Sequence, residues 1–162
     1  MTNGMRRVFI LRKDLHLSTG KLCAMVAHCA EAYWTRMIAA KLQHTLKYNE
    51  DVGRLEPTKD YSAQISDLDG DIVDNYIKAS FTKTICEARN LNQLMKAETI
   101  AKELGLIENV DYGFIDDNCL TELTPEFIGA DGKPHCRVGI WFKPLPDETA
   151  HLISKKFPLY RD

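Results

Sequence analysis

The stretch VFILRKDLHLSTGKLCAMVAHC, residues 8–29, joins a short apolar run to the start of an amphipathic helix. The apolar run at 8–11 is bounded by arginines and predicts a buried strand. Ser18 or Thr19 is placed to cap the helix, because apolar residues recur at helical spacing after them. We expect this helix to continue to about Leu46. A strand that leads directly into a helix is typical of an α/β fold.

The rest of the chain continues this alternation. Strands are predicted at 81–86, 112–117 and 137–142, and helices at 71–77, 90–104 and 144–155. Residues 49–66 are polar and show no sustained period, so we expect a loop within a polar, acidic insertion at about 49–78. The pattern predicts a single domain over residues 1–162, a three-layer α/β/α fold with a mixed, mostly parallel four-stranded sheet.

Composition restricts the class of protein. The chain has 162 residues, of which 44% are hydrophobic, enough for one core. No apolar run approaches the ~20 residues that cross a bilayer. The five cysteines are odd in number and lack CxxC spacing, which fits a reducing compartment. We therefore expect a cytoplasmic protein.

Charge is distributed unevenly along the chain, although its net value is only -2. Residues 1–48 contain eight Lys or Arg against two Asp or Glu, residues 49–131 are acidic, and the final segment is basic again. The two ends could form one electropositive face that attracts a polyanion. A solvated surface with scattered charges is the alternative.

Lys21 lies in the first turn of the predicted helix, where free N–H groups and the helix dipole favour an anion. The sequence has neither a P-loop nor a Rossmann glycine pattern, since Leu22 follows the lysine where a P-loop needs Ser or Thr. His28 follows seven residues later, on the same helix face. A solvated capping lysine and a core histidine bonded to a backbone carbonyl are the alternative interpretations.

Asp116 and Asp117 stand at the end of the predicted strand 112–117. Ligands of α/β proteins bind beyond the carboxyl ends of parallel strands, so this is a candidate site. Successive strand side chains point to opposite faces, and only one of these two carboxylates can face the helix that carries Lys21 and His28.

Three ordered motifs resemble the second, archaeal and eukaryotic type of peptidyl-tRNA hydrolase. They are RKDLHLSTGKLCAMVAHC (12–29), IDDNCLTELTPE (115–126), and KPLPDE (143–148) with the closing KKFPLY (155–160). The resemblance covers residues 5–46 and 79–162. It implies hydrolysis of the ester that joins a peptide to the 3′ end of tRNA, by a homodimer, with no cofactor.

The resemblance also implies the site residues. Asp117 would orient or deprotonate the attacking water, and Lys21 would neutralise the oxyanion or a terminal phosphate. Thr121 would hold the substrate or the water, and His28 would position Lys21 or Asp117. The chain departs from the family pattern at Met25, where the family has Gln, at Cys119, where it has Gly, at Leu120, where it has a basic residue, and at Asp116, which replaces an Arg or another polar residue.

Binding of tRNA is expected to depend on phosphate contacts. The candidate contacts are Arg6, Arg12, Lys13 and Lys143, and the acidic insertion should lie away from the RNA. A covalent route through Cys119 and His28 is an alternative mechanism. The alternative functions are an RNA-binding module without activity and a nucleotide or small-ligand domain. The His and Cys residues are too few and too loosely spaced to predict a metal site.

Overall fold

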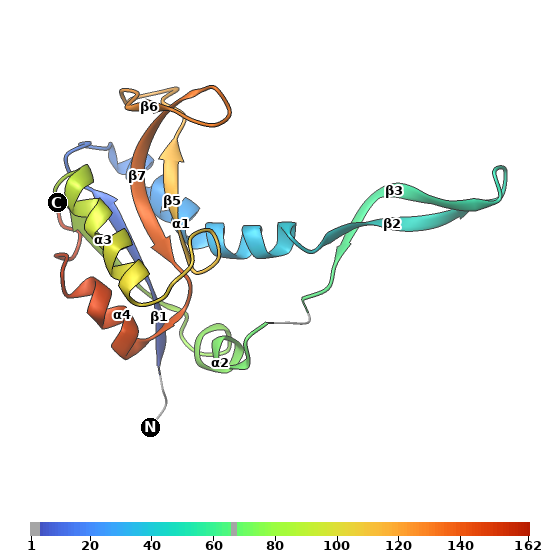
Figure 1. Ribbon diagram of the computed structural model, residues 1–162, viewed down its shortest axis with the longest axis horizontal. Helices are drawn as coiled ribbons and strands as arrows, with labels where there is room; N and C mark the ends of the chain where they lie inside the picture. Colours follow the sequence, from blue (N-terminus) through green and yellow to red (C-terminus); the bar gives the residue numbers. More distant parts are fainter. Residues whose placement is uncertain (1–3, 66–67) are drawn as a thin grey trace.

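The computed structural model describes residues 4–65 and 68–162. Its elements in chain order are β1 (Met5–Arg12), α1 (Thr19–Ala39), β2 (Leu42–Asn49), β3 (Arg54–Ala63), α2 (Gly70–Ile72), the π-helical turn η1 (Val73–Ile77), β4 (Thr82–Ala88), α3 (Leu91–Glu103), β5 (Tyr112–Asp117), β6 (Phe127–Ile128), β7 (Pro134–Phe142), β8 (Leu145–Pro146) and α4 (Asp147–Ser154). Figure 1 shows a body in which helices cover the main sheet and from which β2 and β3 project as an arm. None of these helices is long and apolar enough to cross a membrane.

The main sheet is mixed, as predicted, but among the described residues the short strands β6 and β8 extend it from the four predicted strands to six. Its central strands follow the order β4-β1-β7-β5, while β6 pairs with β7 and β8 with β1. Strands β1 and β4 are parallel from Arg6↔Thr82 to Arg12↔Ala88, and β7 is antiparallel to both β1 and β5. Strands β1, β4 and β5 therefore point the same way, and their carboxyl ends meet at one edge of the sheet.

The prediction of a mostly parallel sheet was wrong, because β1–β4 is the one parallel strand pair in the part of the sheet that the structure describes. Parallel neighbours need a crossover connection, usually a helix. The segment between β5 and β7 contains only the short strand β6 and no helix among its described residues. β7 therefore returns beside β5 in the antiparallel direction.

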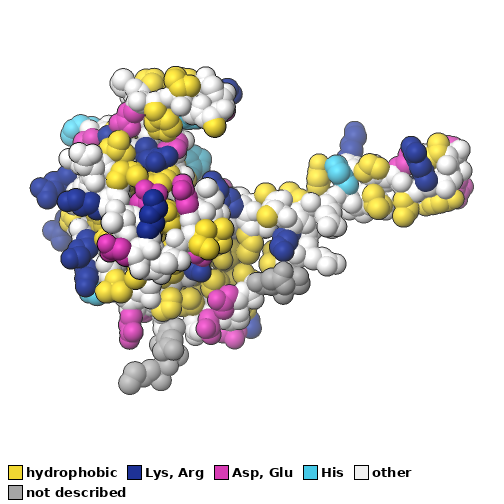
Figure 2. Space-filling model, in the orientation of Figure 1, with side chains coloured by type: hydrophobic (Ala, Val, Ile, Leu, Met, Phe, Trp, Pro, Cys, Tyr) yellow, Lys and Arg dark blue, Asp and Glu magenta, His cyan; other side chains and the backbone are white. Residues whose placement is uncertain are grey.

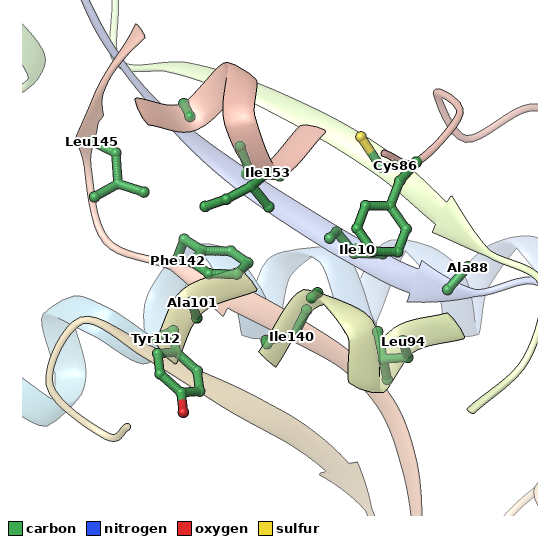
Figure 3. Close-up of a cluster of buried hydrophobic side chains, with 14 residues drawn as sticks. Ile10, Cys86, Ala88, Leu94, Ala101, Tyr112, Ile140, Phe142, Leu145 and Ile153 are labelled. Carbon is green, nitrogen blue, oxygen red and sulfur yellow. The ribbon is translucent and has the colours of Figure 1, made fainter. Parts of the chain in front are cut away.

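Helices cover both faces of this sheet, which confirms the three predicted layers. On one face, α3 and α4 bury Leu94, Ala101 and Ile153 against Ile10, Ile140 and other strand residues, as Figure 3 shows. On the other face, α1 buries Met25 and Cys29 against β1 and β7. Arg7, fully buried in β1, donates to the carbonyl oxygens of Cys29, Ala30 and Phe142 and so fixes α1 to the sheet.

The end of α1 and the segment after it differ from the prediction. The helix ends at Ala39, not near Leu46, and residues expected to form its last turns and the loop 49–66 form the β2–β3 hairpin. Leu42 and Leu46 are four residues apart and continue the helical pattern. Apolar or aromatic residues at 42, 44, 46 and 48 also alternate with polar ones, and the period of two is the one that the structure adopts.

The second half of the predicted insertion forms α2 and η1 beside the body. Asp69 caps α2, two residues before the predicted start of this helix, since its side chain accepts a hydrogen bond from the backbone N–H of Asp71. Residues 66 and 67 of the predicted insertion lie outside the described residues. The predicted strand 112–117 matches β5, and the predicted helix 90–104 matches α3, which Asn90 caps.

Candidate active site

Lys21 and Asp117 meet in an ion pair, although 96 residues separate them in the sequence. The ammonium Nζ of Lys21 lies 2.5 Å from the carboxylate Oδ2 of Asp117. The side chains are 17% and 10% exposed, so the pair is shielded from bulk water. The first turn of α1 and the carboxyl end of β5 are thereby joined, at the sheet edge where the sequence analysis placed the site.

The position of each charge follows from local structure. Ser18 caps α1, and its hydroxyl accepts a hydrogen bond from the backbone N–H of Lys21. Asp117 uses its second oxygen, Oδ1, to accept the backbone N–H of Cys119 at 2.9 Å. Of the two adjacent aspartates, Asp117 faces α1, while Asp116 pairs with Arg137 at 2.9 Å. The expectation that only one of them reaches Lys21 is therefore confirmed.

A cavity of about 280 Å³ opens beside this ion pair. Its lining comprises Lys21, Met25, His28, Ile115, Asp116, Asp117, Asn118, Leu120 and Thr121. All four residues that the resemblance assigns to the site thus border one cavity. The histidine and the threonine are both exposed and therefore accessible to a ligand. Met25 is 3% exposed and gives the cavity an apolar wall.

Glu122 connects the two halves of the site, and sequence reasoning missed it. Its carboxylate accepts the backbone N–H of Ser18 at 2.9 Å and the Ser18 hydroxyl at 2.7 Å. Both hydrogen bonds lower the pKa of Glu122, and the one from the Ser18 backbone has the larger effect. A local capping box would need an acid or amide at position 21, which is Lys21, so the sequence around Ser18 gave no sign of this partner.

Arg12 is buried, and its side chain is saturated with hydrogen bonds. Its guanidinium donates to both oxygens of Glu126, to Asp14 and to the carbonyl oxygen of Arg137. Burial acts to lower the pKa of Arg12, but the hydrogen bonds to Asp14 and Glu126 outweigh it and raise the net value. Arg12 thereby joins Asp14, in the segment after β1, to Glu126, which precedes β6. Only 5% of its side chain is exposed, so we do not propose Arg12 as a tRNA contact.

The other three predicted tRNA contacts lie at two different edges of the sheet. Lys13 directly follows β1 and so stands at the same edge of the sheet as the cavity. Arg6 begins β1 and Lys143 follows β7, which places both at the opposite edge. Arg6 pairs with Asp147, and Lys143 pairs with Asp111. The structure does not bring these two residues to the candidate site.

Further basic side chains stand at this edge of the sheet. Arg89 follows the carboxyl end of β4, and the carbonyl oxygen of Arg161 accepts a hydrogen bond from Lys13. Figure 2 shows Lys and Arg side chains gathered on the side of the body where Figure 1 places the C-terminus. We call Lys13, Arg89 and Arg161 the basic edge. It joins residues from both ends of the chain, as the charge distribution suggested.

Cys119 is poorly suited to be a nucleophile. Burial raises the pKa of its thiol, and the neighbouring carboxylates of Asp117 and Glu126 raise it further. The reactive form of cysteine is the thiolate, which such surroundings disfavour. In the described ranges 4–65 and 68–162, no group of three or more His, Cys, Asp or Glu side chains is arranged to hold a metal ion.

The fold and the ion pair define the class of protein. It is an α/β protein with a cavity at the edge of the sheet where the carboxyl ends of β1, β4 and β5 meet. The family model described as peptidyl-tRNA hydrolase PTH2 matches residues 5–160 of the chain, which therefore belongs to this family. A search of the curated proteins found no match. The family match includes the whole 49–78 region, which the sequence resemblance had left out.

Proposed function

We propose that the protein hydrolyses the ester bond of peptidyl-tRNA and releases free tRNA and peptide. Membership of a peptidyl-tRNA hydrolase family supports this reaction. The observation that carries the proposal is the shielded Lys21–Asp117 pair at the wall of a cavity large enough for a small part of the substrate. Ester hydrolysis needs a held water and a donor for the oxyanion, and this pair offers both kinds of group.

Asp117 orients the water and accepts its proton as the bond to the acyl carbon forms. Each carboxylate oxygen has two lone pairs, so the contacts to Lys21 and Cys119 leave room for a water. The ion pair with Lys21 holds the Asp117 carboxylate in place, which makes orientation of the water the larger part of its role. The bond between the acyl carbon and the ribose oxygen then breaks, and the proton passes to that oxygen, which leaves as the tRNA hydroxyl.

Lys21 stabilises the negative charge that develops on the carbonyl oxygen. An ammonium has three N–H donors, and the described contact to Asp117 uses one of them. Thr121 offers a hydroxyl at the open side of the cavity, where it holds the substrate. His28 lies on the same face of α1 as Lys21, one helical turn beyond Met25, and positions the ammonium or the substrate end.

The test is release of tRNA from a purified peptidyl-tRNA by single variants. Lys21→Ala should lower kcat about 10²- to 10³-fold, the usual cost of removing an oxyanion donor. Asp117→Asn preserves an acceptor for the N–H of Cys119 but removes the charge, and it should lower kcat about 10²- to 10⁴-fold. Wild-type rates in both variants would reject the proposal.

Matched controls separate chemistry from folding. Lys102→Ala removes an exposed lysine from α3, on the opposite face of the sheet, and Asp74→Asn removes an exposed aspartate from η1. Both should keep wild-type turnover. If wild-type protein binds tRNA but never cleaves the ester, the protein is instead a binding module with the same fold. We further propose that the active protein is a cytoplasmic homodimer.

A further inference from the structure

A second pocket, of about 440 Å³, lies between the second half of α1, η1 and the start of β4. It is lined by Trp34, Tyr76, Ile77, Phe81 and Lys83, and we call it the aromatic pocket. The rings of Trp34 and Tyr76 stack with their centroids 6.3 Å apart. Ile77 and Phe81 are 41% and 57% exposed, so the apolar lining is open to solvent. Such a lining suits an apolar group from a binding partner.

Lys83 supplies a positive charge at the rim of the aromatic pocket. Its ammonium lies 5.0 Å from the ring centroid of Phe81 and 5.6 Å from that of Tyr76. It donates to the carbonyl oxygen of Phe81 at 2.7 Å, which leaves two of its three N–H donors. Among the described residues, no carboxylate pairs with it. Burial, and after it the charge of Arg7, lower the pKa of Lys83, so a carboxylate brought by a ligand would stabilise its charged form.

The aromatic pocket borders an open part of the sheet edge. β4 is an outer strand, and the segment 158–160 forms backbone hydrogen bonds with Ile85 and Glu87 along its free edge. Successive residues of a strand direct their N–H and C=O groups to opposite sides, so those of Lys83 also face this edge. Arg161 donates to the side chain of Glu87 and does not continue along β4. In the described part of the chain, the backbone of Lys83 has no partner on this side.

The surroundings of the aromatic pocket favour a peptide over a nucleic acid. Residues 69–78, which form α2, η1 and the start of the next turn, contain three Asp and one Lys. Phosphates of RNA need an excess of cations, which this region lacks. An unpaired strand edge is a template for another extended chain. Peptides that add to a sheet edge use backbone hydrogen bonds for affinity and side-chain pockets for specificity, and the two features lie side by side here.

We propose that an extended segment of a partner protein adds to β4 at Lys83 and places a large apolar side chain in the aromatic pocket. Ile85 packs on the α1 face of the sheet, and Lys83, two residues before it, has its side chain on the same face. Alternate residues of the added strand share a face too. The segment therefore carries an apolar residue and, two positions away, an acidic residue that pairs with the Lys83 ammonium.

This inference goes beyond the proposed activity. Lys83 lies near the start of β4, whereas the Lys21–Asp117 cavity lies where β4 and β5 end. The two sites are therefore at opposite edges of the sheet, and a partner bound at the aromatic pocket leaves the cavity open.

NMR titration of the isotope-labelled full chain tests the proposal. The probe is a capped seven-residue peptide of serine and threonine, with phenylalanine at its third position and aspartate at its fifth. It should shift the amides at the start of β4 and the indole N–H of Trp34, with a dissociation constant between about 10 µM and 1 mM. No shift at about 5 mM peptide would overturn the proposal. A stronger shift of the same signals by adenosine monophosphate would make this a nucleotide site and overturn it as well.

Two variants with matched controls test the apolar pocket and the charge. Ile77→Asp should weaken peptide binding about tenfold or more, because it places a carboxylate in the apolar lining. Ile107→Asp makes the same change at an isoleucine that is 61% exposed outside the pocket, and it should leave binding unchanged. Lys83→Met should weaken binding about threefold, and Lys78→Met, which removes an exposed lysine paired with Asp74, should not. Unchanged binding in Ile77→Asp and Lys83→Met would overturn the proposal.

Changes to the peptide test the contact without altering the protein. Asparagine in place of the peptide aspartate should weaken binding about threefold in wild type and have no further effect in Lys83→Met. Every second N–H of an added strand faces β4. Methylation of successive backbone nitrogens should therefore alternate between a loss of about tenfold and a change below about threefold. Equal effects at all positions would overturn strand addition.

Hydrolysis of peptidyl-tRNA serves as the separate readout. Ile77→Asp and Lys83→Met should keep wild-type turnover, because the aromatic pocket lies at the opposite edge from the cavity. A protein that hydrolyses peptidyl-tRNA and binds no peptide would reject this inference alone, and one that binds the peptide without turnover would reject the proposed function alone.

Discussion

Cys119 occupies a conformation that suits glycine. Its φ is +55°, in the left-handed region that side chains with a Cβ disfavour. The family has glycine at this place, and the structure supplies the physical reason. The strain falls directly beside the site, since the backbone N–H of Cys119 donates to Asp117. The loop therefore retains the geometry of the site at a cost in stability.

Cys119→Gly should stabilise the protein and leave turnover intact. Relief of the left-handed strain is worth about 1–2 kcal/mol, and the greater backbone entropy of glycine in the unfolded chain offsets about half of it. Thermal unfolding should show a Tm higher by about 1–4 °C. The matched control, Cys23→Gly in the exposed interior of α1, should instead lower the Tm. A Cys119→Gly protein that folds but has no turnover would favour the covalent route.

Leu120 leaves a charge missing at the mouth of the cavity. It is 85% exposed at a place where the family has a basic residue. Leu120→Lys should lower KM for peptidyl-tRNA about threefold at low salt, leave kcat unchanged, and steepen the dependence of log KM on log salt by about 0.7–0.9. Leu152→Lys, at an exposed site on α4, should change none of these. An unchanged salt slope in Leu120→Lys would mean that this position does not approach a phosphate.

At the scale of elements, Glu122 fastens the loop after β5 to the first turn of α1. The folded pKa of Glu122 lies below its ordinary value of 4.5, because Ser18 donates two hydrogen bonds to the charged form. Its charged form therefore contributes stability that is complete above the unfolded pKa and lost as the pH falls through the folded pKa. Because Lys21 belongs to α1 and Asp117 ends β5, the contact between Glu122 and Ser18 helps to fix the position of Lys21 relative to Asp117.

Glu122→Gln should be destabilised at neutral pH, and the difference from wild type should fade in acid. Urea unfolding should be measured from neutral pH downward. The difference in the free energy of unfolding between wild type and variant should stay constant to about pH 5 and decrease below it. Glu103→Gln, an exposed change on α3, is the control and should show no such trend. If the difference in the free energy of unfolding stayed constant at acidic pH, the effect of Glu122 would come from the shape of its side chain and not from its charge.

Helices and strands whose own residues define them were predicted correctly from the sequence. Segments whose structure depends on contacts with distant residues were not. The apolar stripe and capping Asn90 of α3 define it without reference to the rest of the chain. After Ala39, Leu42 and Leu46 fit both a helix and a strand, and the pairing with β3 decides between them. The site shows the same division, since Lys21 and Asp117 follow from motifs, whereas Glu122 depends on a contact 104 residues away.

At the scale of the whole molecule, strand direction decides which cations serve the site. Arg6 and Arg12 stand at the two ends of one strand, six residues and so about 20 Å apart. Charges counted along the sequence do not show that the two ends of β1 lie at opposite edges of the sheet. The parallel directions of β1, β4 and β5 gather Lys13, Arg89 and Asp117 at one edge and leave Arg6 and Lys143 at the other.

The basic edge should therefore account for the electrostatic part of tRNA binding. Lys13→Ala and Arg89→Ala should each weaken tRNA affinity about 3- to 10-fold near 0.1 M salt and reduce the slope of log K against log salt by about 1, since each removes one phosphate contact. Lys143→Ala and Arg6→Ala should leave both quantities unchanged, because their partners Asp111 and Asp147 hold them at the opposite edge. Equal losses from all four variants in filter binding would mean that the RNA extends over the whole length of the sheet, and the assignment of recognition to one edge would fail.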